Sequence, residues 1–391
     1  MSAKKKTSTK KLKVALVCDW LTNVGGAEKV LLELHGLFPE APIYTSKYDR
    51  DGISWFKDAE IRTGWLQIFP TGMRRILGPL RQIWFSHLDL SDYDVVISVT
   101  GAEAKAVKTR NKKTGKKAIH ISYCHVPTQY YWQMYDEYMK DPGFGKLNPV
   151  VRAIFRVAVK PLRAADYKAA KRVDKFVTIS EYARELMRKY YDRESEIIHP
   201  PVDTIDFSIK VLKSQGRGNT QVVENYYIVT SRQVNWKRLD IAVEACKELG
   251  RELVVVGEGP EHNSLVKLAK NVPSVRFLPL IEKKELAEIL GRAKGYLFPS
   301  LEPFGIAPVE ALSAGCPVIA LGRGGALDYV KDGKNGVLFK EQTVESLKKA
   351  IVRFEKMKFE REKVSESAKK FAAKRFDKEI CRVIDEVGRK N

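Results

Sequence analysis

The segment EPFGIAPVE, residues 302–310, decides the fold of this chain and points to its site. It follows a strand-like run, GYLFPS at 295–300, and precedes AGCPVIALGRGG at 314–325, a second strand that ends in a glycine turn. The segment itself predicts a helix that opens at Gly305-Ile306. A strand, a helix and a second strand in succession are typical of a parallel α/β sheet.

Two carboxylates bracket the N-terminus of this predicted helix. Glu302 lies with Phe304 on the approach loop, and Glu310 lies inside the helix. A helix N-terminus presents free N–H groups and the positive end of a dipole, which suit an anion such as a diphosphate. Gly305 lets backbone and ligand approach closely. A carboxylate on each side can hold ribose or sugar hydroxyls. The segment therefore predicts a nucleotide-sugar site whose contact residues are Glu302, Phe304, Gly305, Ile306 and Glu310.

Both carboxylates also have a simpler interpretation. Glutamates in the first turn of a helix are commonly surface charges that the helix dipole favours, and this alternative stays open for Glu302. It fits Glu310 less well, because the neighbours of Glu310 are apolar and no cation is close in sequence. A carboxylate on a buried face needs a partner, and a ligand hydroxyl is one candidate.

The length and composition predict a soluble protein of two domains. A chain of 391 residues is too long for one core. No apolar run approaches the roughly 20 residues that span a bilayer, and residues 1–12 are expected to form a disordered basic tail rather than a secretory signal. The five cysteines have no metal-binding spacing, which favours reduced thiols in a cytoplasmic protein.

The net charge of +21 favours an anionic partner. Residues 1–203 hold 35 Lys and Arg against 23 Asp and Glu, and the remainder holds 34 against 25, so both halves are basic. Nucleic acid, an anionic membrane and a phosphate-rich ligand all fit this charge. Because no segment has the signature of a nucleic-acid-binding module, no nucleic-acid partner is expected.

Strands alternate with helices in both halves, which predicts two doubly wound parallel sheets, each Rossmann-like. The expected strands are 13–19, 94–100, 117–125, 175–180 and 196–203 in the first half, and 226–231, 252–259, 274–280, 295–300 and 317–321 in the second. These strands place an N-terminal domain at 13–205 and a C-terminal domain at 206–374. Ligands are expected beyond the strand C-termini, in the cleft between the domains.

Eight segments in order across both halves carry a resemblance to a known family. They are GGAEKVLLEL, ISYCHVPTQYYW, DKFVTISEYAREL, IIHPPVD, YIVTSRQVNWKRLDIAVEA, VVVGEGPE, EPFGIAPVEALSAGCPVIA and DGKNGVLF. With these segments the chain resembles the retaining glycosyltransferases of family 4, which have the GT-B fold. The resemblance implies that the C-terminal half holds the sugar nucleotide and the N-terminal half takes the acceptor. It also implies that a final helix, at about 375–391, packs back on the N-terminal domain.

Arg232 and Lys237 follow the first strand of the second half, where α/β sites form. A guanidinium and an ammonium there can neutralise a leaving diphosphate, which is the role that the resemblance implies. It also implies that these cations replace a metal ion, so neither a metal nor another cofactor is expected. Two ordinary surface cations are the alternative. The usual Lys-Gly of the family is Lys237-Arg238 here.

His125 ends a strand in the sequence YCHVP. Taken alone, such a histidine is more often a packed or surface residue. The resemblance implies instead the active-site histidine, beside the reacting carbon of the donor sugar. The aromatic run QYYW at 129–132 is similar to that of bacterial polysaccharide enzymes, many of which use GDP-mannose. Their His-Thr-Pro-Met-Arg-Tyr is His-Val-Pro-Thr-Gln-Tyr here.

Four further positions enter the predicted site. Gly25 and Gly26 open the first helix, so their amides can meet a phosphate or the acceptor; a plain tight turn is the alternative. Glu258 and Leu280 end strands where the family places the nucleobase.

Two basic stretches, 71–88 and 149–172, mix cations with Ile, Leu, Phe and Trp at roughly helical spacing. They predict peripheral contact with an anionic bilayer. Amphipathic helices with a solvated cationic face are the alternative.

These features together predict a cytoplasmic, metal-independent, retaining glycosyltransferase, peripheral at the inner face of the membrane. It would move a hexose, best mannose from GDP-mannose, to a glycan or polyprenyl-linked acceptor. Glu310 is expected to hold the ribose, Glu302 the sugar hydroxyls and His125 the sugar near its anomeric carbon. A sugar-nucleotide 2-epimerase of the same fold and a basic nucleic-acid-binding protein are the alternatives.

Overall fold

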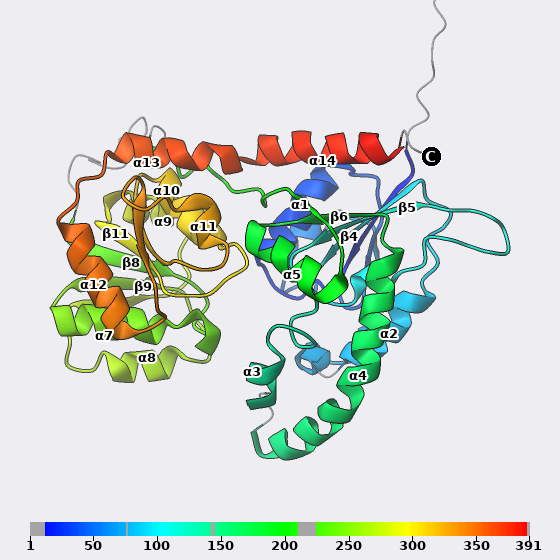
Figure 1. Ribbon diagram of the computed structural model, residues 1–391, viewed down its shortest axis with the longest axis horizontal. Coiled ribbons are helices and arrows are strands. Elements are labelled where there is room, and N and C mark those ends of the chain that lie inside the picture. The colour runs from blue at the N-terminus through cyan, green and yellow to red at the C-terminus, as the bar shows by residue number, and fades with distance from the viewer. Residues whose placement is uncertain (1–11, 76, 141, 143–144, 210–223, 389–391) are drawn as a thin grey trace, which may run out of the picture. The chain divides into compact units, whose positions relative to one another are not determined.

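The computed structural model describes residues 12–75, 77–140, 142, 145–209 and 224–388 (Figure 1). The chain divides into two compact units. Unit 1 holds the residues up to Ile179, Arg184–Ile198 and those from Glu379 onward; unit 2 holds Ser180–Ala183 and His199–Lys378. The chain therefore leaves unit 1 at Ile198, a few residues before the predicted boundary. All of the predicted basic tail except Leu12 lies outside the described residues.

Unit 1 is built on a seven-stranded sheet in the order β3-β2-β1-β4-β5-β6-β7. All of its strand pairs are parallel. The strands are β1 Val14–Cys18, β2 Ile43–Thr45, β3 Ile61–Arg62, β4 Val95–Thr100, β5 Ile119–Cys124, β6 Lys175–Thr178 and β7 Glu196–Ile197. The chain order reverses between β1 and β4, so the loops that follow these two strands lie at the point where α/β sheets bind ligands.

Unit 2 is built on a six-stranded sheet in the order β10-β9-β8-β11-β12-β13, again with all pairs parallel. The strands are β8 Tyr226–Thr230, β9 Glu252–Val256, β10 Val275–Leu278, β11 Gly295–Phe298, β12 Val318–Leu321 and β13 Gly336–Phe339. Here the chain order reverses between β8 and β11. The predicted fold, two Rossmann-like parallel sheets, is thus observed.

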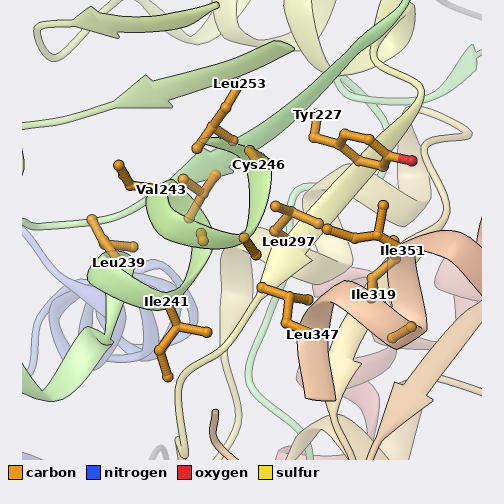
Figure 2. Close-up of a cluster of buried hydrophobic side chains, with 14 of the residues drawn as sticks. Tyr227, Leu239, Ile241, Val243, Cys246, Leu253, Leu297, Ile319, Leu347 and Ile351 are labelled. Carbon is orange, nitrogen blue, oxygen red and sulfur yellow. The ribbon is translucent and has the colours of Figure 1, made fainter. Parts of the chain in front are cut away.

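The core of unit 2 shows how the sheet holds its helices. Thr343 caps α12 (Val344–Glu355) by accepting a hydrogen bond from the Ser346 amide at 3.2 Å. The helix then buries Leu347 and Ile351 at a spacing of four residues, on one face. Figure 2 shows both side chains among those of the sheet strands, beside Leu297 and Ile319. Full burial of one such side chain stabilises the fold by about 1.5–3 kcal/mol.

The predicted final helix corresponds to α14 (Ala373–Gly388). It follows α13 (Arg361–Ala368) and a 3₁₀ turn (Lys369–Phe371), and these are the red elements of Figure 1. The residues of α14 from Glu379 onward belong to unit 1. Ile380 and Val383 are buried there, and Arg382 pairs with Glu196 of β7. Apolar packing and one ion pair thus fix the end of the chain in unit 1.

A buried ion pair joins the loop after β4 to α4 (Asn148–Arg172) in unit 1. Lys105 Nζ lies 2.6 Å from Asp166 Oδ1, and neither side chain is exposed. Burial disfavours the ammonium, but the surrounding charges, Asp166 foremost, outweigh this and raise the pKa of Lys105. Asp166 also accepts hydrogen bonds from Thr128, Trp132 and Tyr191. One carboxylate therefore ties together four separate parts of the unit.

We predict that Lys105→Met destabilises the protein by about 3 kcal/mol, because it leaves the Asp166 carboxylate buried without its counter-ion. Urea unfolding measures the change. Lys171→Met is the matched control, since Lys171 of α4 also pairs with an aspartate, Asp192, but at the surface; its unfolding midpoint should not change. Equal midpoints for the two variants would contradict the importance of the buried pair.

Candidate functional site

The predicted cation and carboxylate of unit 2 meet at the reversal between β8 and β11. Lys237 ends a 3₁₀ turn (Asn235–Lys237) after β8, and Glu302 lies on the loop after β11. Lys237 Nζ is 2.5 Å from Glu302 Oε2, and each side chain is less than one-fifth exposed. The hydroxyl of Ser300 donates to the Lys237 carbonyl at 3.0 Å. The two loops are therefore fixed to each other.

A glycine turn holds the loop of Glu302 in place. The Gly325 amide donates to the Glu302 carbonyl at 2.8 Å, and a β-carbon at position 325 would lie only 2.3 Å from the α-carbon of Phe304. Gly305 has φ +92°, and a β-carbon there would meet the ring of Phe298 at 2.7 Å. Only glycine fits at these two positions.

The helix that opens at this loop is α10 (Ile306–Ser313), with Gly305 as its N-cap. Its first amides have no partner within the helix, as at any helix N-terminus. Glu310 is buried within the helix. Burial is the main cause that raises the pKa of the Tyr296 phenol, and the charges of Glu302 and Glu310 raise it further. Both predicted carboxylates therefore lie close enough to act on one neutral phenol.

The Phe304 side chain lies in the core of unit 2, where it cannot make the ligand contact that the sequence predicts. It is buried and stacks on His199 with ring centroids 5.5 Å apart. Its ring also meets Tyr329 and Phe371 edge-on. The ring is thus part of the core under the loop and has no open face for a ligand, because aromatic neighbours cover it.

The remaining predicted residues of unit 2 lie on exposed loops. Arg232 is exposed after β8 and makes no ion pair with any residue that the structure describes. Glu258 is exposed after β9, and Leu280, after β10, is 84% exposed. These side chains are free to meet a ligand.

Two neighbours of Arg232 that the sequence did not single out shape these loops. Gln233 is fully buried, and its amide donates to the Gly257 carbonyl at 2.5 Å, which joins the loops after β8 and β9. Trp236 is a large aromatic side chain that remains 46% exposed next to Lys237.

Arg238 explains how the chain makes its turn without the usual glycine. It adopts φ +52° and ψ +41°, a left-handed conformation that costs a non-glycine residue about 1–2 kcal/mol. Its guanidinium donates to the carboxylate of Asp240 at 2.9 Å. This ion pair offsets part of the strain, so the turn that positions Lys237 is kept.

His125 lies in unit 1 at the end of β5. Its amide donates to the Thr100 carbonyl at 2.8 Å, and its ring meets Tyr123 edge-on. Ring atom Nε2 is buried and finds no hydrogen-bond partner among the described residues. Burial lowers the pKa of His125 to about 4, so the ring is neutral at pH 7. A buried polar atom without a partner is costly, which favours a role in binding a ligand.

Gly25 and Gly26 lie where α1 (Gly26–Leu37) begins. Gly25 is extended, with φ −161°, so its backbone does not require glycine. A β-carbon on Gly25 would however lie 2.8 Å from Glu28 Oε2. A carboxylate thus already lies beside this helix N-terminus, which suits a hydroxyl group better than a phosphate.

Asp19, at the end of β1, is a further residue that the sequence reasoning missed. It accepts hydrogen bonds from the Thr100 hydroxyl and from the amides of Gly101, Ala102 and Ala104. It therefore holds the loop after β4 in shape at the reversal point of unit 1. A lone Asp after a strand carries no sequence signal for contacts about 80 residues away.

The described residues contain no group of three or more His, Cys, Asp or Glu that could hold a metal ion. Two Asp-x-Asp spacings exist, Asp49-Arg50-Asp51 in the loop after β2 and Asp92-Tyr93-Asp94 just before β4. Asp49 accepts from the Gly52 amide at 3.1 Å. Asp92 pairs with Lys116 at 2.6 Å, and Asp94 accepts from the Lys13 amide at 2.8 Å. Both have protein partners at the opposite end of the sheet from His125, because β4 and β5 are parallel.

Residues 214–371 match the family Glycosyl transferases group 1. The chain is 23% identical to the uncharacterized glycosyltransferase MJ1069 of Methanocaldococcus jannaschii, over 92% of this chain and 93% of that protein. It is 24% identical to the uncharacterized glycosyltransferase MJ1178 of the same organism, over 53% of this chain and 57% of that protein. Residues 214–371 are thus a glycosyltransferase domain, and the predicted enzyme class is confirmed for this part of the chain.

Solved structures agree with this fold. The crystal structure of Anabaena HepE in complex with UDP and glucose covers 96% of this chain and 100% of its own, with a TM-score of 0.66 and 18% identity. The sucrose-phosphate synthase of Thermosynechococcus elongatus has a TM-score of 0.70 and 15% identity, with 97% of this chain covered. The predicted GT-B fold is therefore confirmed.

We predict that His125→Gln reduces the loss of stability on acidification. The folded pKa of about 4 lies below the ordinary 6.5. Between these values the unfolded chain therefore binds more protons, and stability falls as the pH is lowered, by at most about 1.4 kcal/mol per pH unit. Urea unfolding at pH 7, 6 and 5 checks this. His120, whose pKa burial also lowers to about 4, should keep part of the slope in the variant. An unchanged slope would show that His125 protonates freely in the folded protein.

Proposed function

We propose that this chain transfers a hexosyl group from a nucleotide diphosphate sugar to a hydroxyl acceptor, with retention of configuration and without a metal. The observation that carries the proposal is the Lys237–Glu302 pair at the N-terminus of α10, at the reversal point of unit 2. A cation, a carboxylate and a helix N-terminus at one place suit a sugar diphosphate, because each binds a different part of it.

Each side chain of unit 2 has one role in this proposal. Lys237 and Arg232 neutralise the charge that develops on the leaving diphosphate, and the first amides of α10 bind its oxygens. Glu310 accepts hydrogen bonds from the ribose hydroxyls, and Glu302 from those of the sugar. Before the donor binds, Lys237 and Glu302 neutralise each other, so neither charge is left uncompensated in the partly buried site.

Retention by a front-face reaction needs no separate protein base. The bond from the anomeric carbon to the phosphate oxygen breaks while the acceptor oxygen bonds to the same face of that carbon. The proton of the acceptor passes to the phosphate oxygen that leaves. A neutral His125 fits this chemistry, since its ring can hydrogen-bond a sugar hydroxyl and is not required to carry the proton.

We propose mannose from GDP-mannose as the donor, and a glycan or polyprenyl-linked sugar as the acceptor. Support comes from the resemblance of the aromatic segment 129–132 to that of bacterial polysaccharide enzymes, many of which use GDP-mannose. UDP sugars are the main competitor, because the related HepE structure contains UDP and glucose. A thermal-shift panel of UDP, GDP and ADP and their sugars decides between them, since a bound ligand raises the melting temperature.

We predict that GDP or UDP binds in the presence of EDTA, and that Lys237→Ala or Glu310→Ala weakens this binding by at least about tenfold, or 1.4 kcal/mol. Lys237→Ala removes the charge that contacts the diphosphate. Glu310→Ala removes the carboxylate that accepts hydrogen bonds from the ribose. Isothermal titration calorimetry measures it. Lys348→Ala is the matched control, because Lys348 also pairs with glutamates but lies on α12. If EDTA abolishes binding, the metal-free mechanism is wrong; unchanged affinity in both variants refutes the site.

We predict that His125→Ala lowers turnover on the order of a hundredfold, about 2.7 kcal/mol, while nucleotide affinity stays within a few-fold. The reason is that His125 would act mainly as the sugar–phosphate bond breaks. Turnover and melting temperature are measured on the same preparation, with the exposed His87→Ala as control. A variant that melts early but keeps its turnover would identify His125 as a packing residue only.

A further inference from the structure

The first half of α4 carries an apolar surface that the fold of unit 1 does not use. In Figure 1 this end of the long green helix lies away from the sheet of its own unit. One face of α4 packs inward, where Phe155, Val159 and Leu162 meet the aromatic side chains of residues 130–138. Packing of the unit is therefore complete without the other face.

The outward face presents a second apolar stripe. Val150, Ile154 and Val157 follow one another at helical spacing and are 57%, 64% and 78% exposed. Leu147, just before the helix, is 62% exposed on the same side. A single exposed apolar residue needs no explanation, but four in a row on one helix face mark an interaction site.

The charges around this stripe are almost all positive. Residues 145–172 contain eight Lys and Arg and a single acidic residue, Asp166. Asp166 is buried against Lys105, so it does not offset the surface charge. Lys160, three residues after Val157, is exposed at the edge of the stripe, and Arg156 is exposed farther around the helix. Lys168 is exposed beyond Pro161. The nearest carboxylates in sequence on either side of this stretch are Asp141 and Asp174.

Among its described residues, the other basic stretch predicted for this role lacks such a surface. In α2 (Gly78–His87), Arg81 is buried and lies 2.9 Å from Glu103. Phe85 and Leu77 are buried as well, whereas Ile83 is 50% exposed. The arginine and most of the apolar residues of this helix are thus used within the unit, which leaves α4 as the better surface.

We propose that the face of α4 formed by Val150, Ile154, Arg156, Val157 and Lys160, the docking face, binds an anionic lipid bilayer. The apolar side chains enter the headgroup boundary, and Arg156 and Lys160 contact lipid phosphates. None of the helices among the described residues is long and apolar enough to cross a bilayer, so such contact is peripheral. This proposal depends on the proposed function in one respect only, namely that the acceptor is linked to a polyprenyl lipid.

A bilayer fits this face better than a protein does. Its charge is of one sign over more than two helical turns, which suits a broad anionic surface. A protein partner would need an acidic groove with an apolar floor. The outcome of the test that would favour such a partner is the absence of binding to anionic vesicles.

We predict that the full chain co-sediments with vesicles of phosphatidylglycerol and phosphatidylcholine, and that raising the salt concentration releases it. Ile154→Glu with Val157→Glu should lower vesicle binding at least about tenfold, because both changes place carboxylates in the docking face. Arg156→Gln with Lys160→Gln should weaken binding less and flatten its salt dependence. All four positions are exposed, so melting temperatures should stay close to that of the wild type.

The matched control is Val266→Glu with Val352→Glu, which makes the same change of charge at exposed apolar positions on α8 (His262–Leu268) and α12 of unit 2. This variant should bind vesicles like the wild type. Equal binding of wild type to pure phosphatidylcholine, no binding to anionic vesicles, or normal binding of the docking-face variant would each refute the proposal. Nucleotide affinity is measured in parallel: no nucleotide binding by the wild type would point to a failure of the proposed function instead.

Discussion

The proposed donor site depends on one close backbone contact in unit 2. The Gly325 amide bonds to the Glu302 carbonyl at 2.8 Å, and the two backbones approach so closely that a β-carbon on Gly325 would overlap Phe304. This contact fixes the direction in which the chain leaves β11. Gly305 can then turn at φ +92° and start α10, while Glu302 faces Lys237. The ion pair follows from the backbone arrangement, because a carboxylate on a loosely held loop would lose too much side-chain entropy to stay paired in a partly buried place.

Unit 1 also holds a loop after a central strand in place with a carboxylate, but through hydrogen bonds. At its own reversal point, the loop after β4 turns sharply and leaves several backbone amides pointing inward. Asp19 accepts hydrogen bonds from three of them and from the Thr100 hydroxyl. Burial raises the pKa of Asp19, but the donors around it favour the ionised form and so limit that rise. Both units thus place a carboxylate after a central strand. In unit 1 it accepts hydrogen bonds from backbone amides, and in unit 2 it pairs with an ammonium.

The sequence predicted those features that are local and failed for those that depend on distant contacts. EPFGIAPVE showed the helix start and both carboxylates, because the glycine, the apolar run and the charges lie within nine residues. The strands β2 and β3 have three and two residues, too few for a recognisable pattern. Phe304 looked like a ligand contact until its aromatic neighbours, far away in sequence, were known. Arg238 shows the same limit, since only its φ of +52° in the structure reveals that this residue adopts the left-handed conformation.

The state of His125 limits what the chemistry in unit 1 can be. Its ring is neutral at pH 7, because burial lowers its pKa to about 4, and its buried Nε2 has no hydrogen-bond partner among the described residues. A neutral imidazole contributes no charge to stabilise a leaving diphosphate, so in the proposed mechanism Lys237 and Arg232 have that role. Protonation of His125 would have to overcome the same burial that lowers its pKa. If His125 acts on the donor sugar as proposed, it therefore acts as a fixed hydrogen-bonding group. The proton of the acceptor must then go elsewhere, and the leaving phosphate oxygen, which gains negative charge as the bond breaks, is the group whose basicity rises at that moment.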